Sequence, residues 1–159
     1  MLLKGLPPII DAEARILILG SFPSPASLAA EQYYAHRQNQ FWRVLAAIIE
    51  KPMIEMEYAA KQAVVRAAGL AIWDVYGACE REGSLDSAIR GGEPNRFEAL
   101  KKLAPRLARV CFNGQSAAKF DQTLALLGYQ TFVLPSTSPA NAGWSFERKL
   151  AAWRLALTG

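Results

Sequence analysis

Four short runs of apolar residues alternate along the chain with segments in which apolar residues recur at helical spacing. Continuous apolar runs predict strands that are buried on both faces, and helical spacing predicts amphipathic helices. The expected strands cover residues 15–19, 70–75, 108–112 and 131–134. The expected helices cover about residues 39–50, 57–68, 115–127 and 145–157, and a further helix begins near Asn95.

This alternation of strands and helices is typical of a parallel sheet with helices packed on both faces. We therefore predict the α/β class, as a three-layer α/β/α fold around a central four-stranded parallel sheet. At 159 residues the chain fits one domain that spans residues 1–159. Two segments lack a periodic pattern. Residues 1–14 are expected to run extended along the sheet edge, and residues 76–93 are expected to form a long loop, which is uncommon in a compact domain unless it has a function.

Polar side chains follow each expected strand. The first strand ends in GSFPS (residues 20–24), the second ends at Asp74, and the third and fourth are followed by Asn113 and by residues 136–141. Because the carboxyl ends of parallel strands meet at one edge of the sheet, ligands bind there in open α/β folds. The sequence therefore predicts a functional site at this edge.

The composition narrows the chemistry available to such a site. His36 is the only histidine, and Cys79 and Cys111 lack the spacing of metal ligands, so we expect no metal site. The chain has no GxSxG, Walker A or GxGxxG motif, so the usual signatures of serine hydrolases and phosphate-binding loops are missing. What remains are amides, hydroxyls, a carboxylate and aromatic rings, which suit the recognition of a planar heteroaromatic group and the positioning of water.

The net charge and the hydropathy of the chain limit its binding partners and its location in the cell. The net charge of +4 permits an anionic partner such as nucleic acid but does not require one. No apolar run approaches the roughly 18 residues of a membrane span, and the first residues do not form a signal peptide. We expect a cytoplasmic protein with reduced cysteines and no membrane partner.

Several motifs resemble those of a known family when they are taken together and in order. These motifs are GSFPS, YYAH-x-QN-x-FW, WDV-x-x-x-C-x-R-x-GSLD and PSTSPAN. They are similar to those of the uracil-DNA glycosylase superfamily, and most similar to its hypoxanthine-DNA glycosylase (DNA-deoxyinosine glycosylase) branch, over about residues 4–157. The resemblance implies the uracil-DNA glycosylase-like fold and a monofunctional enzyme of base excision repair. Such an enzyme flips a deaminated base, here hypoxanthine, out of double- or single-stranded DNA and hydrolyses its N-glycosyl bond without a cofactor. We expect it to act as a monomer.

The resemblance also assigns roles to residues. It implies that Asn39 is catalytic and positions a water molecule, that Phe22 stacks on the flipped base, and that Asp74 contacts the edge of the base. Gly20 and Ser21 complete the base-binding set. The DNA-binding set implied by the resemblance consists of Ser24, Ser136, Ser138 and Asn141.

The chain also departs from the family pattern. The well-studied uracil enzymes carry Asp or Asn in the first motif, where this chain has Phe22, Pro23 and Ser24, and a histidine where it has Ser136. Members of the family insert a side chain, called the wedge, into the gap that the flipped base leaves. This chain has Asn141 and Ala142 at that position, and neither is large and apolar, so no wedge residue is assigned.

Other interpretations stay open at the level of sequence. Asn39 also fits the N-cap of the helix that follows it, and Asp74 could cap a loop or pair with Arg81 or Arg90. His36 is either a packed or surface histidine or a catalytic one. Alternative functions are a glycosylase that prefers uracil or xanthine, a catalytically silent nucleic-acid-binding module on the same fold, and a hydrolase of small nucleotides.

Overall fold

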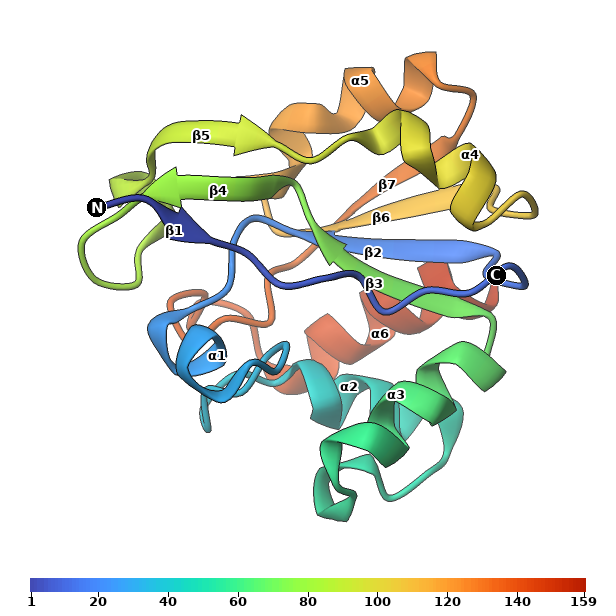
Figure 1. Cartoon of the computed structure of the whole chain (residues 1–159). Coiled ribbons are helices and arrows are strands. Elements are labelled where there is room, and N and C mark those ends of the chain that lie inside the picture. Colours follow the sequence, from blue (N-terminus) through green and yellow to red (C-terminus); the bar gives the residue numbers. More distant parts are fainter.

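Four parallel strands in the order β3-β2-β6-β7 form the central sheet of the computed structural model, which describes residues 1–159 (Figure 1). The four strands are β2 (Ile16–Gly20), β3 (Leu70–Asp74), β6 (Arg109–Asn113) and β7 (Gln130–Leu134). Their parallel pairing confirms the predicted sheet. The carboxyl ends of all four strands lie at the same edge.

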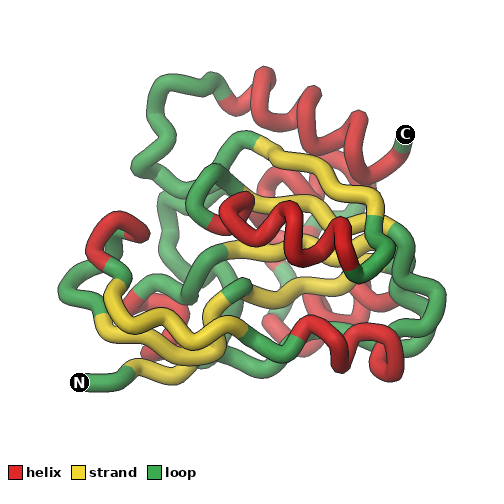
Figure 2. Tube along the Cα trace, turned by 90° about the horizontal axis from the view of Figure 1, so that it is seen from above, coloured by secondary structure: helices red, strands yellow, loops and turns green.

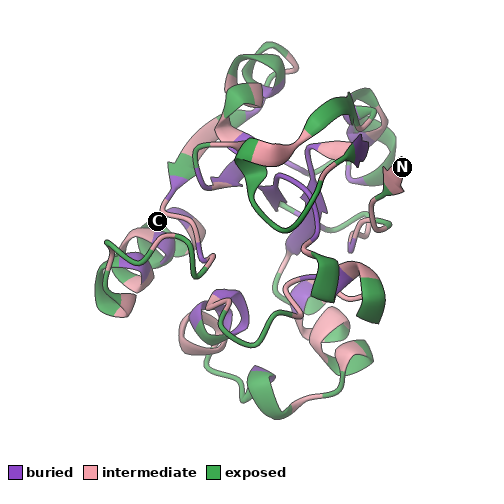
Figure 3. Cartoon of the chain, turned by 90° about the vertical axis from the view of Figure 1, so that its left-hand side faces the viewer, coloured by how far each residue is buried: buried purple, intermediate pink, exposed green.

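Helices cover both faces of this sheet, which gives the predicted three layers (Figure 1). One face packs against α2 (Phe41–Ile49), α3 (Tyr58–Ala67) and α6 (Phe146–Thr158), and the other against α4 (Leu100–Leu103) and α5 (Asp121–Leu126). Successive strand residues alternate between the two cores, as the pleat requires. Ile18 and Ile72 belong to the first core, and Leu19 and Trp73 to the second. Figure 3 shows these strands as the buried centre of the molecule.

Short elements complete the three layers. They are α1 (Pro25–Ala30) and the 3₁₀ turns η1 (Met53–Glu55), η2 (Asp86–Ala88), η3 (Phe97–Ala99) and η4 (Ala117–Phe120). Helix α1 was not expected from the sequence. It begins because the Ser24 hydroxyl accepts a hydrogen bond from the Ser27 N–H, and because Pro25 is already fixed in a helical φ at the first position.

A second, antiparallel sheet corrects the prediction of a loop over residues 76–93. Strands β4 (Tyr76–Glu80) and β5 (Arg90–Pro94) form a hairpin, and β1 (Leu3–Lys4) pairs with β4 on its other side (Figure 2). The sequence of β5, RGGEP, is exposed throughout and contains two glycines, so it carries no alternation of apolar and polar residues. Only pairing with β4 makes it a strand.

The N-terminal residues run along the edge of the central sheet, as expected. Ile9 forms an isolated antiparallel bridge with Ile72 of edge strand β3. Cys79 and Cys111 are both buried and free. None of the helices combines the length and the apolar character that crossing a membrane requires.

Candidate functional site

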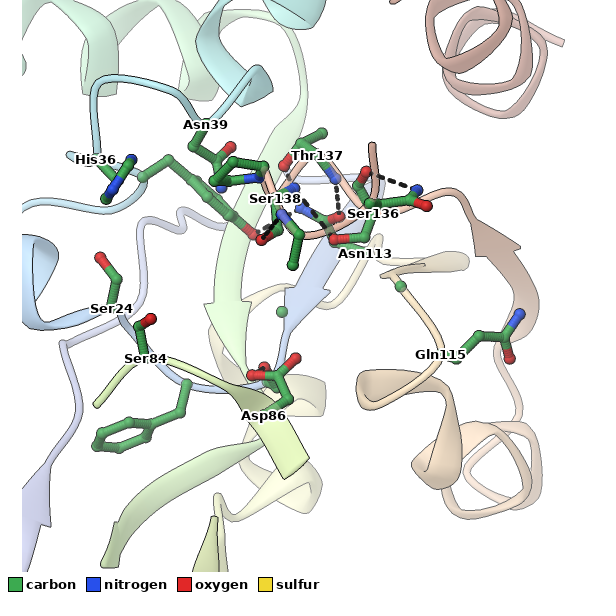
Figure 4. Close-up of a pocket in the computed structure, with 18 of the residues that line it drawn as sticks. Ser24, His36, Asn39, Ser84, Asp86, Asn113, Gln115, Ser136, Thr137 and Ser138 are labelled. Atoms are coloured by element: carbon green, nitrogen blue, oxygen red, sulfur yellow. Dashed lines mark hydrogen bonds between the residues drawn. The ribbon is translucent and has the colours of Figure 1, made fainter. Parts of the chain in front are cut away.

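A cleft of about 910 Å³ opens at the carboxyl edge of the central sheet (Figure 4). This volume lies within the range of ligand-binding pockets. The loops after β2, β6 and β7 line it, together with the last residue of β3, Asp74, and the segment that joins β4 to β5. The convergence predicted from the strand ends is therefore confirmed. The cleft-lining residues include Gly20, Ser21, Phe22, Ser24, Tyr34, His36, Asn39, Asp74, Asn113, Ser136, Thr137, Ser138 and Asn141.

Asp74 is a buried acid in this cleft. It ends strand β3, only 4% of its surface is exposed, and its Oδ2 atom is buried without a hydrogen-bond partner. The pKa of Asp74 is raised to about 7, mainly by burial and also by the nearby Asp86 carboxylate, while the Arg81 guanidinium acts in the opposite direction. Neither Arg81 nor Arg90 forms a salt bridge with Asp74, so the ion-pair interpretation was wrong. The carboxyl is left free for a ligand.

Gly20 gives this carboxyl its space. The two residues are register partners on adjacent strands β2 and β3. A Cβ atom on Gly20 would lie 2.6 Å from Asp74 Oδ1 and 2.9 Å from the Tyr34 hydroxyl oxygen. Only glycine permits this close approach. The carbonyl of Asp74 is held in turn by Asn95, whose Nδ2 donates to it at 2.7 Å.

Tyr34 lies between the cleft and the core. Its ring stacks on Phe41, with ring centroids 3.9 Å apart, and its hydroxyl oxygen accepts a hydrogen bond from Asn113 Nδ2 at 3.2 Å. Its backbone adopts φ 55°, a conformation that is strained for a bulky residue. Burial and the Asp74 carboxylate raise the pKa of the Tyr34 phenol, so this group stays a neutral hydroxyl. Tyr33 is 2% exposed and belongs to the first core, and its hydroxyl donates to the carbonyls of Leu6 and Pro7.

Asn113 connects three parts of the site. Besides Tyr34, its Nδ2 donates to Thr137 Oγ1 at 3.0 Å, and its Oδ1 accepts from the Thr137 N–H at 3.0 Å (Figure 4). Thr137 is fully buried, and its carbonyl accepts from the Gln40 N–H. The loop after β7 is thereby fixed against both β6 and the start of α2.

Asn39 accepts a hydrogen bond at the start of helix α2, but it is not the N-cap residue that one interpretation of the sequence made it. Its Oδ1 accepts from the Phe41 N–H at 2.9 Å, although Gln40 is the residue at the N-cap position itself. Asn39 is half-buried and lines the cleft, and its Nδ2 has no hydrogen-bond partner within the protein. The capping bond fixes the amide plane and leaves the NH₂ group free.

The loop after β2 is held from both sides. Ser21 Oγ donates to Asp86 Oδ1 at 2.7 Å, and Arg81 Nη2 donates to the Pro23 carbonyl at 2.8 Å. Phe22 is 7% exposed, and the Arg81 guanidinium carbon lies 5.4 Å from the centroid of its ring. Ser24 caps α1. Ser21, Phe22 and Ser24 all line the cleft.

The loop after β7 is ordered by its own polar groups. Ser136 Oγ accepts from the Ser138 N–H, Ser138 Oγ accepts from the Ala140 N–H, and Asn141 Nδ2 donates to the Ser136 carbonyl. The two serine hydroxyl hydrogens have no partner within the protein. His36, on the opposite rim, is exposed and accepts from the Gln38 N–H through Nδ1.

Some cleft residues were not assigned from the sequence. Ser84, Leu85, Asp86 and Ser87 come from the segment predicted to be a loop, and Thr137 lies between the two serines of the PSTSPAN motif that were predicted to bind DNA. The GSLD string points to three of them, since it ends the WDV-x-x-x-C-x-R-x-GSLD motif. No group of three or more His, Cys, Asp and Glu residues is placed to hold a metal ion.

Known proteins with similar sequences and structures agree on one family. The model of the uracil DNA glycosylase superfamily matches residues 7–157. Two archaeal relatives named hypoxanthine DNA glycosylase are similar over 94% of this chain and 94% of their own length. They are 40% identical in Methanosarcina acetivorans and 38% identical in Methanosarcina barkeri. A solution NMR structure of a Methanosarcina acetivorans protein, named for uracil DNA glycosylase, superposes with a TM-score of 0.90 at 39% identity and covers 99% of this chain and 97% of its own.

Proposed function

The chain belongs to the uracil DNA glycosylase superfamily, and we propose that it is a monofunctional DNA glycosylase that excises hypoxanthine from DNA. The names of the two Methanosarcina relatives support hypoxanthine as the base. In the structure, the observation that carries the proposal is the buried, unpartnered carboxyl of Asp74 on the wall of the cleft.

Asp74 fits the edge that distinguishes hypoxanthine from adenine. Hypoxanthine presents a lactam, with an N1–H donor beside an O6 acceptor. A carboxyl whose pKa is about 7 is largely protonated below that pH, so one oxygen accepts from N1–H while the hydroxyl donates to O6. Negative charge develops on the base as the glycosyl bond breaks, and the bond to O6 strengthens with it. Uracil and xanthine carry the same lactam edge, which keeps them as alternative substrates.

Asn39 is the proposed catalytic residue. Its free NH₂ group and the second lone pair of Oδ1 suffice to hold one water molecule on the cleft side of α2. The oxygen of that water attacks the sugar C1′, the bond to the base breaks, and the base departs with the electron pair and takes up the proton. Positioning of the water, rather than deprotonation by a strong base, is the contribution that an amide makes.

The remaining residues bind the nucleotide and its neighbours. Phe22 stacks on the flipped base, and Gly20 and Ser21 shape the floor of the cleft beside Asp74. The hydroxyls of Ser24, Ser136 and Ser138, with the amide of Asn141, contact DNA phosphates, as hydroxyl and amide side chains commonly do.

The product is an abasic site. The reaction uses water as the nucleophile, and no lysine lines the cleft to form a Schiff base with the sugar. Lys149, which is 2% exposed, donates through Nζ to Gln40 Oε1 instead. The reaction as proposed needs no metal and no organic cofactor, and a monomer carries every residue assigned to it.

The test is a cleavage assay on end-labelled duplexes and single strands that carry inosine, uracil or xanthine, followed by alkali. Hypoxanthine release and alkali-dependent breaks at inosine support the proposal. Breaks at uracil or xanthine alone would move the substrate within the class. Tight, salt-dependent binding without release of any base would replace the enzyme by a silent binding module, and consumption of free inosine would indicate a nucleoside hydrolase.

A further inference from the structure

A leucine stands exposed on the rim of the cleft. Leu85 belongs to the GSLD segment between β4 and β5, lines the cleft, and is 58% exposed. Neither hydrophobic core includes it, even among the partly buried residues at its margin. Since this leucine contributes nothing to the packing of the fold, its presence on the rim indicates a contact with a molecule that binds in the cleft.

The segment that carries Leu85 is anchored on both sides. Arg81 donates to the Pro23 carbonyl before it, and Asp86 accepts from Ser21 Oγ directly after it. Leu85 also begins a 3₁₀ turn, in which its carbonyl accepts from the Ala88 N–H at 3.0 Å. Both anchors lie in the loop that forms the floor of the cleft. The position of Leu85 relative to the base-binding residues is therefore fixed.

The opposite wall offers no equivalent side chain. Residues 136–141 on that wall are serine, threonine, proline, alanine and asparagine. Trp144 also lines the cleft, but its ring is already in contact with the Arg148 guanidinium, 4.0 Å from the ring centroid. Val133 is the other exposed large apolar residue of the cleft, but it belongs to strand β7 rather than to a projecting loop. The remaining exposed large apolar residues do not line the cleft.

A nucleotide that leaves a duplex leaves a gap between its neighbours, and apolar side chains fill such gaps in proteins that distort DNA. We propose that Leu85 is the wedge of this protein: it enters the base stack and keeps the flipped nucleotide in the cleft. This inference rests on the proposed excision of a flipped base. It assigns the wedge to the β4–β5 segment, on the wall opposite the loop after β7.

The test compares Leu85→Ala with the wild type on an inosine duplex and on the same strand without its complement. We expect the single-turnover rate of base release to fall roughly tenfold or more on the duplex and to stay unchanged on the single strand. A pyrene nucleotide opposite inosine, which fills the gap by itself, restores the duplex rate of Leu85→Ala. Leu85→Met retains activity, and Leu155→Ala, which removes an exposed leucine of α6 that does not line the cleft, has no effect on either substrate.

The outcomes separate the wedge from the function. If Leu85→Ala loses the same rate of base release on duplex and single strand, or if pyrene does not restore its duplex rate, Leu85 is not a wedge. The proposed glycosylase activity is unaffected by either result. The same pattern of loss and rescue in Pro139→Ala, with Leu85→Ala unaffected, places the wedge on the opposite wall and also overturns it. Absence of base release by the wild type from every inosine substrate overturns the proposed function, and the wedge with it.

Discussion

Asp74 at the end of edge strand β3 and Gly20 at the end of the neighbouring strand β2 lie side by side in the cleft. They are register partners, and a Cβ atom on Gly20 would approach Asp74 Oδ1 to 2.6 Å. A carboxyl this close to a neighbouring backbone has few rotamers left, so its oxygens are held in one arrangement in the wall of the cleft. The absent side chain of Gly20 therefore orients the acid that we propose to bind the base.

Gly20→Ala should displace Asp74 and Tyr34 together, because the new methyl group would also lie 2.9 Å from the Tyr34 hydroxyl oxygen. A shift of about 1 Å in a binding group costs about 100-fold in rate, and we expect a loss of that order in hypoxanthine release. Gly143→Ala is the matched control, since nothing lies within 4 Å of the Cβ position there. Full activity of Gly20→Ala in a single-turnover assay would mean that Asp74 does not contact the base.

The pH dependence of excision should follow the protonation of Asp74. Its pKa is raised to about 7, first by burial and then by the Asp86 carboxylate. The protonated form is the one that donates to O6, so the rate of hypoxanthine release should fall as the pH rises through about 7. Asp74→Asn presents an amide donor and acceptor at every pH. It should stay active with a flat profile between about pH 6 and 8, because an amide does not titrate. An unchanged profile in Asp74→Asn would assign the titration to another group.

Protonation of Asp74 also makes the free energy of unfolding depend on pH. The pKa of Asp74 is higher in the folded protein than its ordinary value of 3.8, so the folded state holds this proton more tightly. The resulting stability is fully present below about pH 3.8, falls as the pH rises from there to about 7, and does not change further at higher pH. In denaturant titrations, Asp74→Asn should therefore be less sensitive to pH across this window than the wild type. A steeper dependence in the variant would contradict the raised pKa.

Much of this arrangement follows from local patterns. The apolar runs that contain Ile18 and Ile72 predicted both strands, and the rule that parallel strands end at one edge brought Asp74 and Asn113 to the same cleft. Those inferences hold because burial on two faces leaves a strong, contiguous signal in the sequence.

Other parts depend on contacts between distant residues, which no local pattern encodes. Ser21 and Asp86 are 65 positions apart in sequence, and their hydrogen bond exists only because the β4–β5 hairpin folds over the loop after β2. The hairpin itself was missed because the residues of β5 are exposed and pair rather than pack. The position of Tyr34 depends on such contacts too: its ring stacks on Phe41 of the core, and its hydroxyl oxygen accepts from Asn113 Nδ2 beside the cleft.

Asn39 has a capping role and a proposed catalytic role, and two variants separate them. Asn39→Ala removes both, whereas Asn39→Ser retains an oxygen that can cap α2 but has no amide to hold water. We expect each variant to lose about 100-fold or more in hypoxanthine release. Only Asn39→Ala should lose about 1 kcal/mol of stability in thermal unfolding. If Asn39→Ser released hypoxanthine at the wild-type rate, the amide would be a cap and nothing more.

Asn113 should matter to stability more than to the chemical step. Its side chain makes hydrogen bonds with Tyr34 and with the side chain and backbone of the fully buried Thr137. Asn113→Ala leaves the Thr137 N–H without its acceptor, which costs about 1–3 kcal/mol for a buried polar group. The loop that carries Ser136 and Ser138 should also become less ordered. The affinity for inosine duplex should therefore fall by a larger factor than the rate of base release at saturating enzyme.

Gln115→Ala is the control, because Gln115 is exposed, makes no hydrogen bond and lies apart from the other labelled residues of the cleft (Figure 4). Unfolding curves and binding isotherms of the two variants measure both effects. A loss confined to the rate, with stability and binding unchanged, would make Asn113 part of the catalytic group instead of its support.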